Sequence, residues 1–305
     1  MRRHGVNYIK DINMKKIQAK KVVKRGRKPI LKQDAKIEGP KELVKYPDGV
    51  EKNHGVWNNR LIVATPSTGS VRMEWVLSRY GQIIPTNWSH VEMIEWINPY
   101  VPIQYLLPDA ENLIAKKVVE GNFEWLLSIE EDNLLPADTF LKINEYIRKG
   151  DVPIVSGLYW TKSHPAEPIL YRGRGNGAFT DFKVGEKVWV DGIPFGFTLI
   201  HGSIIKAMWD ESPEYTVNGI ATRRVFNTPD RSWMGPEGQS NVTGTTDLQW
   251  CTRIMKEDFF KKAGWPAFQK KQYPFLVDTN ILIGHIDKQG RQFPLGGIPP
   301  EFKKK

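Results

Sequence analysis

Short apolar runs alternate with segments of helical periodicity along most of the chain, beginning at Arg60. The runs are rich in β-branched and aromatic residues and end in polar ones, which is typical of buried strands. The predicted strands cover residues 60–67, 102–110, 123–133 and 153–160. The predicted helices cover residues 73–84, 111–122 and 136–150. Strands that alternate with helices in this way predict an α/β fold, in which helices flank a mainly parallel, doubly wound sheet.

The second half of the chain is less regular. Residues 187–208 predict a strand, a glycine-rich crossing and a helix, residues 246–264 a further helix, and residues 274–287 a closing strand. Residues 210–246 are rich in Gly, Pro, Asn, Ser and Thr and show almost no periodicity. A stretch of this length without regular structure is typical of a lid, a binding loop or a disordered segment. Among these we predict a lid that orders when its ligands bind.

Positive charge is concentrated at one end of the chain. Residues 1–56 contain 16 Lys and Arg against 6 Asp and Glu, whereas residues 57–305 contain 28 of each kind. The net charge of +10 therefore belongs to the first segment, which has little apolar periodicity and is predicted to be mostly disordered. Two interpretations of this basic tail stay open. It is either a solvated tail or a tether to a polyanion, such as nucleic acid or an acidic lipid surface.

These patterns divide the chain into the basic tail (residues 1–56), one globular domain (residues 57–290) and a C-terminal tail (residues 291–305). Cys251 is the only cysteine, which excludes an internal disulfide and a zinc site built from several cysteines. No apolar run is long enough to form a transmembrane segment, and the N-terminus lacks an apolar signal core. We therefore expect a cytoplasmic protein, located in the cytoplasm of the host cell if the chain is viral.

Three acidic residues follow the third predicted strand, in the sequence SIEEDN. Because side chains alternate along a strand, Glu130 and Asp132 are predicted to project to one side and Glu131 to the other. Two carboxylates that converge at a strand end repel one another unless a cation lies between them, and such oxygen ligands suit Mg²⁺ or Mn²⁺. The alternative is an ordinary acidic turn before a helix, which is how we interpret Glu131 and Asp138.

The order of the segments resembles that of the metal-dependent glycosyltransferases of the GT-A fold, which carry an Asp-x-Asp type motif. The resemblance rests on five segments between residues 60 and 287: DAENLIAKK, SIEEDNLLPAD, VDGIPFGFTLIHGSIIKAM, GTTDLQWCTRI and LVDTNILIGHID. Glu130 stands for the first Asp of the motif, Thr246 replaces the Glu before Asp247, and Glu111 replaces the Arg before Asn112. The chain thus resembles the glycosyltransferases of family 2, and among them a viral or phage type.

This resemblance implies a nucleotide-sugar donor (a UDP- or GDP-sugar), a hydroxyl acceptor that the sequence does not identify, and Mn²⁺ or Mg²⁺ as cofactor. The implied metal ligands are Glu130, Asp132 and His285, and the cation would neutralise charge on the leaving diphosphate. The implied catalytic base is Asp247, which deprotonates the acceptor if the reaction inverts the anomeric centre. Two simpler interpretations stay open, in which Asp247 only caps its helix and His285 is a core histidine.

The remaining implied contacts lie at strand ends and in the aromatic-rich second half of the chain. The implied donor-binding residues are Thr65, Pro66, Ser67, Asp109 and Asn112. The implied acceptor-binding residues are Tyr159, Trp160, Gly196 and Trp233. Ordinary turn chemistry and ordinary core packing are the alternatives for these two groups, and we interpret His164 and His201 as structural.

Two other classes of function stay open. A nucleotidyltransferase would share the strand-end carboxylates and the nucleotide substrate, but it would release pyrophosphate rather than a nucleoside diphosphate. A catalytically inactive binding or tethering protein would act through the basic tail and would not hydrolyse a nucleotide sugar when Mn²⁺ is added.

Overall fold

The computed structural model describes Trp57 and residues 59–88, 100–173, 177–228, 232–235, 238–241 and 245–303. These residues all belong to one compact unit, Lys45–Lys305. The predicted basic tail, residues 1–56, lies outside the described residues. Within the described part of the chain, no helix combines the length and the apolar character that crossing a bilayer requires.

A six-stranded sheet forms the centre of this unit, in the order β1-β2-β6-β4-β11-β5. Its strands are β1 (Asn59–Ala64), β2 (Phe123–Ile129), β6 (Phe197–His201), β4 (Ile154–Leu158), β11 (Phe275–Leu282) and β5 (Lys187–Val190). β1 pairs with β2 and β4 pairs with β11 in parallel. β6 is antiparallel to β2 and β4, and β5 is antiparallel to β11. Since β1, β2, β4 and β11 run in one direction, the predicted mainly parallel sheet is confirmed.

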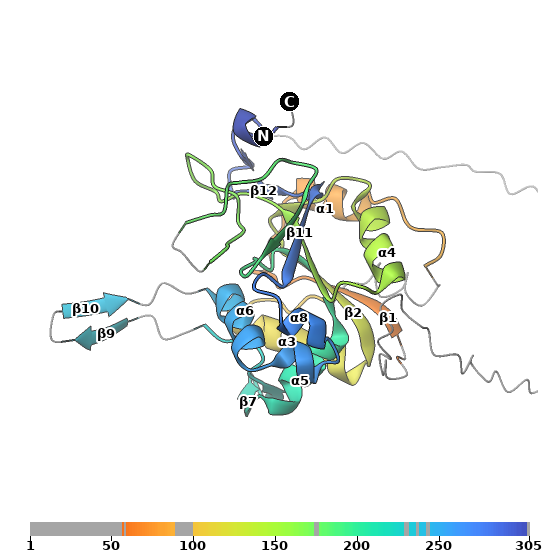
Figure 1. Cartoon of the computed structure of the whole chain (residues 1–305), viewed down its shortest axis with the longest axis vertical. Helices are drawn as coiled ribbons and strands as arrows, with labels where there is room; N and C mark the ends of the chain where they lie inside the picture. Colours follow the sequence, from red (N-terminus) through yellow and green to blue (C-terminus); the bar gives the residue numbers. More distant parts are fainter. Residues whose placement is uncertain are drawn as a thin grey trace, which may run out of the picture. The chain divides into compact units, whose positions relative to one another are not determined.

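Helices cover both faces of the sheet (Figure 1). On one face, α3 (Leu107–Glu120), α5 (Gly202–Glu211) and α6 (Thr246–Lys256) share a core with Ile62 and Leu126. On the other face, α4 (Thr139–Lys149) shares a core with Leu61 and Trp125. Consecutive residues of a strand point to opposite faces, so the apolar residues of these strands supply both cores. The other helices are α1 (Met73–Tyr80), α7 (Phe259–Lys262), α8 (Pro266–Gln269) and the 3₁₀ turn Pro300–Phe302.

The strand predicted for residues 102–110 is wrong, because helix α3 already begins at Leu107. Pro108 explains the difference: it lies in the first turn of α3, where its missing N–H and fixed φ favour a helix start. Only isolated parallel bridges, Ala64 with Tyr100 and Ser67 with Ile103, extend the sheet at this point. Asp109 therefore lies in a first helical turn and not at a strand end.

The prediction that residues 210–246 lack regular structure is also wrong. They contain two antiparallel hairpins, β7 (Glu214–Val217) with β8 (Ile220–Arg223), and β9 (Ser232–Gly235) with β10 (Gly238–Asn241). Asn218 and Gly219, between β7 and β8, have φ of 47° and 80°. Asn-Gly is the preferred pair for a two-residue hairpin turn with positive φ, so the sequence did contain a signal for the first hairpin.

Residues 291–303, which the sequence pattern separates from the domain, pack against it. β13 (Gln292–Phe293) pairs with β12 (Gly284–Ile286), which in turn pairs with β3 (Asn133–Leu134). Phe302 is buried, and its carbonyl accepts a hydrogen bond from the N–H of Val184 at 2.8 Å. This small sheet is important below because β3 and β12 carry residues of the candidate site.

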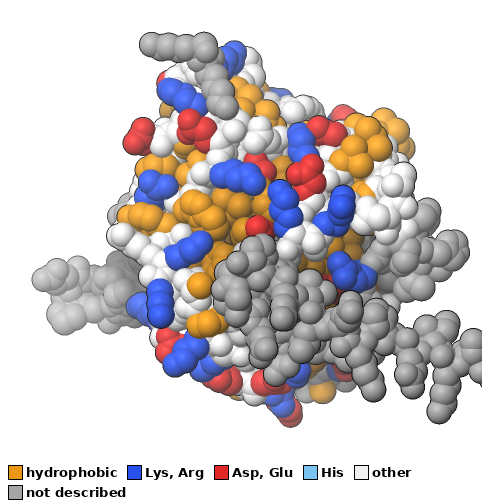
Figure 2. All heavy atoms as spheres, turned by 45° about the vertical axis from the view of Figure 1, so that its right-hand side comes forward, with side chains coloured by type: hydrophobic (Ala, Val, Ile, Leu, Met, Phe, Trp, Pro, Cys, Tyr) orange, Lys and Arg blue, Asp and Glu red, His pale blue; other side chains and the backbone are white. Residues whose placement is uncertain are grey.

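The surface of the described unit mixes charges of both signs. Figure 2 shows one face, on which Lys and Arg side chains alternate with Asp and Glu and apolar side chains lie between them. This distribution agrees with the equal number of acidic and basic residues in residues 57–305.

Candidate functional site

The carboxyl ends of the codirectional strands carry the candidate site. Ser67 lies just after β1, Glu130 directly after β2, Tyr159 directly after β4, and His285 in β12, just after β11. Strands that run in one direction end at the same edge of a sheet, and α/β sheets bind their ligands outside this edge. The edge therefore collects four segments that are far apart in the sequence.

Glu130 is fixed on both sides of its backbone. Its N–H donates to the carbonyl of Gly196 at 2.8 Å, and its carbonyl accepts from the indole N–H of Trp75 at 2.9 Å. Burial raises the pKa of Glu130 to about 8, and the negative charges of Asp132 and Asp247 contribute to this shift. At neutral pH this carboxyl group is therefore mostly protonated, and it can donate a hydrogen bond as well as accept one.

Asp132 and His285 face one another where β3 pairs with β12. The pairing is continued by a backbone hydrogen bond from the N–H of Ile286 to the carbonyl of Asp132, at 2.8 Å. Nε2 of His285 lies 3.6 Å from Oδ2 of Asp132, and the ammonium group of Lys162 donates to the same oxygen. Burial alone would raise the pKa of Asp132, but His285 and Lys162 outweigh it and hold that pKa below its usual value.

The other ring nitrogen of His285 decides which tautomer is present. Nδ1 lies 2.7 Å from the carbonyl oxygen of Trp160, which can only accept, so Nδ1 carries a hydrogen. In the neutral imidazole, Nε2 then presents a lone pair to the carboxylate of Asp132. Two electron-rich atoms that face each other in this way attract a proton or a metal cation between them, and metal-binding histidines are commonly oriented by such a bond to a carbonyl.

Asp132 and His285 thus suit a divalent cation chemically. Oδ1 of Asp132 is buried and has no hydrogen-bond partner among the described residues, so it is available as a ligand. A carboxylate and an imidazole together suit Mn²⁺ at least as well as Mg²⁺. Across the described part of the chain, however, no three His, Cys, Asp or Glu side chains lie close enough together to hold a metal. The pair therefore fits a cation that substrate oxygens would complete, and Glu130 as third ligand stays a prediction.

Three carboxyl groups, those of Glu111, Glu130 and Asp247, form what we call the carboxylate cluster. Glu111 is 6% exposed, and its Oε2 has no hydrogen-bond partner within the described residues. Burial raises the pKa of Glu111 well above its usual value, and the charges of Glu130 and Asp247 add to the effect. Burial and the same two charges also raise the pKa of Tyr159. No role for Glu111 follows from the sequence pattern, in which it replaces the arginine of the motif.

Asp247 lies in the first turn of α6. Its Oδ1 accepts hydrogen bonds from the N–H of Leu248, at 2.9 Å, and from the hydroxyl of Thr245. Burial raises the pKa of Asp247 to about 6, although backbone N–H groups partly oppose the shift. At neutral pH the group is ionised, yet it is basic enough to accept a proton. Helix capping and proton transfer are therefore compatible in this residue.

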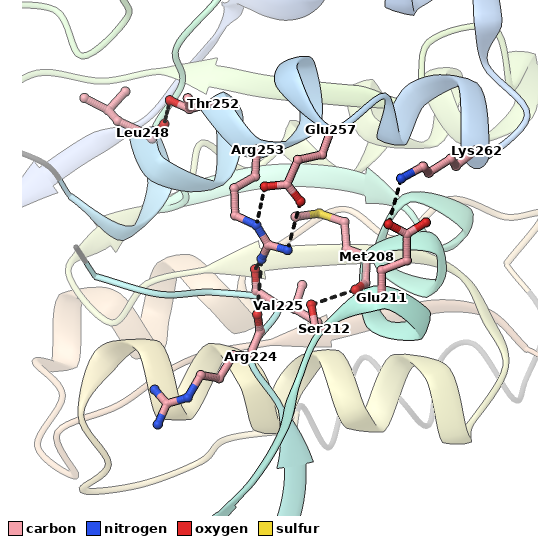
Figure 3. Close-up of polar contacts among 10 residues, drawn as sticks. All are labelled: Met208, Glu211, Ser212, Arg224, Val225, Leu248, Thr252, Arg253, Glu257 and Lys262. Carbon is pink, nitrogen blue, oxygen red and sulfur yellow. Dashed lines mark hydrogen bonds and ion pairs between the residues drawn. The ribbon is translucent and has the colours of Figure 1, made fainter. Parts of the chain in front are cut away.

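The position of α6 is fixed at its other end by Arg253 (Figure 3). One guanidinium nitrogen donates to the carbonyls of Arg224 and Val225, at 3.1 and 2.9 Å. The other two guanidinium nitrogens contact Glu257 at 3.3 and 3.4 Å. These contacts tie the helix to the segment after β8, and so they hold Asp247 in place from a distance.

The loop after β1 is held by Glu131, which the sequence suggested was an ordinary turn acid. Its carboxylate accepts hydrogen bonds from the Ser67 hydroxyl at 2.5 Å, the Thr68 hydroxyl at 2.6 Å and the Thr68 N–H at 3.0 Å. This loop borders a pocket of about 280 Å³. The pocket is lined by Pro66, Ser67, Thr68, Tyr105, Leu107, Ala110, Glu130, Glu131 and Asp132. Two predicted donor-binding residues, Pro66 and Ser67, therefore share one pocket with two predicted metal ligands.

Gly196 is required by close packing at the same place. A Cβ on this residue would lie 2.3 Å from the Asn133 amide and 2.3 Å from the Tyr159 hydroxyl, closer than real contacts allow. Its N–H donates to the Tyr159 hydroxyl at 2.8 Å, and its carbonyl accepts from Glu130. The residue predicted to bind the acceptor thus lets Tyr159 approach the acidic segment.

Three of the predicted donor-binding residues do not line this pocket. Thr65 is buried. Asp109 accepts a hydrogen bond from the Tyr215 hydroxyl at 2.8 Å. The Asn112 amide donates to the same hydroxyl and to the carbonyl of Phe226, both at 2.9 Å, and its oxygen accepts from the N–H of Phe226 at 2.8 Å. In this structure Asp109 and Asn112 therefore fasten β7 and the segment after β8 to α3.

The predicted acceptor-binding aromatics differ in their surroundings. Trp160 lines a second pocket of about 430 Å³, bordered mainly by residues 282–284 and 292–298. Trp233 lies on β9, whose side chains are outside the described part. His201 caps α5 by accepting from the N–H of Ser203, in agreement with a structural role, and His164 is exposed.

Comparisons with known proteins give only distant likenesses. No family model matches the chain, and no curated protein matches its sequence. A197 from STIV aligns over 75% of this chain and 87% of its own, with 14% identity and a TM-score of 0.42. TarS of S. aureus aligns over 50% of this chain and 30% of its own, with 12% identity and a TM-score of 0.33. A shorter TarS structure in complex with UDP aligns over 50% of each chain, with 12% identity and a TM-score of 0.31.

Proposed function

We propose that this protein is a glycosyltransferase, which moves a sugar from a nucleoside diphosphate sugar to a hydroxyl group of an acceptor. The observation that carries the proposal is the pair of Asp132 and His285, whose Oδ2 and Nε2 lie 3.6 Å apart at the edge of a pocket of about 280 Å³ that Asp132 lines. Such a pair suits the cation that accompanies a diphosphate.

The donor would lie in the pocket of about 280 Å³. Ser67 and Thr68, held by Glu131, would line the side of the nucleoside, and Asp132 would face the diphosphate. Asp132 and His285 would hold Mn²⁺ or Mg²⁺, which when bound supplies positive charge to the leaving diphosphate. A UDP- or GDP-sugar fits this proposal equally well.

Asp247 would accept the proton of the acceptor hydroxyl. Its raised pKa of about 6 supports this role, because a base near the working pH is ionised and still binds a proton well. Glu130 lines the same pocket of about 280 Å³ and would be the third ligand of the cation. Tyr159 and Trp160 would border the acceptor, since they follow β4 at the same edge of the sheet.

The test is donor hydrolysis by the full chain with UDP- and GDP-sugars, with and without Mn²⁺. We expect slow, Mn²⁺-dependent release of nucleoside diphosphate from one of the donors. Release of pyrophosphate would instead identify a nucleotidyltransferase. Absence of nucleotide binding and of any product would favour the tethering protein, whose predicted polyanion contact through residues 1–56 could then be measured with DNA and acidic vesicles.

A further inference from the structure

Lys162 contacts the oxygen of Asp132 that lies nearest to His285. Its ammonium group donates to Oδ2 of Asp132, the oxygen that Nε2 of His285 also faces. The Lys162 side chain is 30% exposed, so it is neither buried in the core nor free in solvent. Trp160, two residues before it, holds the other nitrogen of His285 through its carbonyl. One short segment therefore contacts both residues that suit a metal.

Two pockets meet at this lysine. The pocket of about 280 Å³ and a larger one of about 560 Å³ share Thr68, Glu131 and Asp132 as lining residues. The larger pocket is also lined by Lys162 and by two further cationic residues, Arg72 and Lys288. Glu131, Asp132 and Asp287 line this pocket as well, so an anionic group that extends from the smaller pocket past Asp132 would meet Lys162 among charges of both signs.

We propose that Lys162 neutralises Asp132 in the donor-free protein, and that it moves to the diphosphate when a divalent cation replaces it on Asp132. The inference rests on the proposed function. A divalent cation held between Nε2 of His285 and Oδ2 of Asp132 would repel the ammonium group strongly at the same oxygen, and would displace it from there. The flexible four-carbon stem of lysine allows its ammonium group to move without a change in the backbone. The released ammonium group would then donate hydrogen bonds to the diphosphate oxygens.

Calorimetric titration of the full chain tests this exchange, with Mn²⁺ alone and then with UDP and GDP at saturating Mn²⁺. Lys162→Met removes the competing charge and keeps the length of the side chain. We expect it to bind Mn²⁺ alone about fivefold more tightly, on the scale of a partly exposed ion pair. We expect it to bind the nucleotide about tenfold more weakly, since a charge-assisted hydrogen bond is lost. Lys162→Arg should recover most of the nucleotide affinity.

Lys262→Met is the matched control, because Lys262 also forms an ion pair, with Glu211 at 2.7 Å, but does not line either pocket. It should change neither titration. Suppose that the unmodified chain binds the nucleotide in the presence of Mn²⁺, but that Lys162→Met changes neither the Mn²⁺ affinity nor the nucleotide affinity in the expected direction. This result would overturn the role of Lys162 and leave the proposed function standing. If the unmodified chain binds neither Mn²⁺ nor nucleotide, the inference fails together with the metal site of the proposed function.

Discussion

The charged side chains at the two ends of α6 have contrasting surroundings: one end pairs opposite charges, and the other brings like charges together. At the carboxyl-terminal end, Arg253 is matched by two backbone carbonyls and by Glu257 (Figure 3). At the amino-terminal end, Asp247 lies near Glu111 and Glu130, and all three carboxyl groups have raised pKa values. Structural charges are usually paired, whereas like charges held together in a buried place are typical of functional sites. This contrast indicates that the amino-terminal end of α6 belongs to the functional site.

The carboxylate cluster also lowers stability at neutral pH. For a carboxyl group whose pKa is raised by folding, the folded state binds more protons than the unfolded state between the two pKa values. The free energy of unfolding therefore falls as the pH rises from the unfolded value, near 4.3 for Glu, toward the folded one. Substitutions that remove a carboxyl group of the carboxylate cluster should accordingly raise the free energy of unfolding and lower activity. Substitutions at the end of α6 that carries Arg253 should do neither.

The largest effect is expected for Asp247→Asn. The amide oxygen can still accept the hydrogen bond from the Leu248 N–H in the first turn of α6, but the group cannot accept a proton, so transfer to the acceptor should fall by about 10² to 10⁴-fold. Nucleotide binding, measured by calorimetry, should change little. If the variant keeps α6 intact and turns over at nearly the rate of the unmodified chain, Asp247 has only a structural role.

The pH profile of the unmodified enzyme is the companion measurement. Because the pKa of Asp247 is about 6, kcat/KM should fall about tenfold per pH unit well below pH 6. An activity that stays constant down to pH 5 would contradict a base with this pKa.

The second largest effect is expected for Asp132 and His285, the two residues proposed to hold the cation. Asp132→Ala should weaken Mn²⁺-dependent nucleotide binding by about 100-fold, since a charged ligand is lost. His285→Ala should weaken it by only about tenfold, because water can replace one neutral ligand. Calorimetry with UDP and GDP, with and without Mn²⁺, measures both. Equal nucleotide affinity in all three proteins would exclude the pair as a metal site.

A smaller effect is expected for Glu111→Gln, and it concerns stability. Glu111 is buried and its raised pKa makes the folded state less stable as the pH rises above about 4.3. In urea denaturation, the free energy of unfolding of the glutamine variant should match that of the unmodified chain near pH 4.5 and increasingly exceed it as the pH rises to 8. A difference that is independent of pH would mean that packing, and not charge, dominates at this position.

The sequence predicted the central strands and most helices because these segments are long and strongly patterned. It failed at Leu107, where an apolar run was taken as a strand although Pro108 favours a helix start. It failed again at β7 and β8, because four-residue strands give almost no periodic signal. Local pattern identifies elements, but short ones are decided by their partners in the fold.

The candidate site was predictable only in part, for a related reason. Asp132 and His285 were both selected from the sequence, and the structure brings them together through β3 and β12. Glu111 and Lys162 were not selected, because their proximity to the other charges depends on how α3 and the segment after β4 pack. A single charged residue in a sequence does not reveal which other charge lies next to it.

The smallest effect is expected for a surface ion pair outside the site, between Lys262 of α7 and Glu211 of α5. Lys262 contacts Glu211 at 2.7 Å, and both side chains are more than a third exposed. Because exposed ion pairs contribute little and are screened by salt, Lys262→Met should lower the free energy of unfolding by less than about 1 kcal/mol at any pH between 5 and 8. Urea denaturation at low and at 0.5 M salt measures this, and the difference should shrink further with salt. A loss comparable in size to the gain in Glu111→Gln would mean that this surface pair matters as much as the buried cluster, and the contrast between the two kinds of charge would then no longer hold.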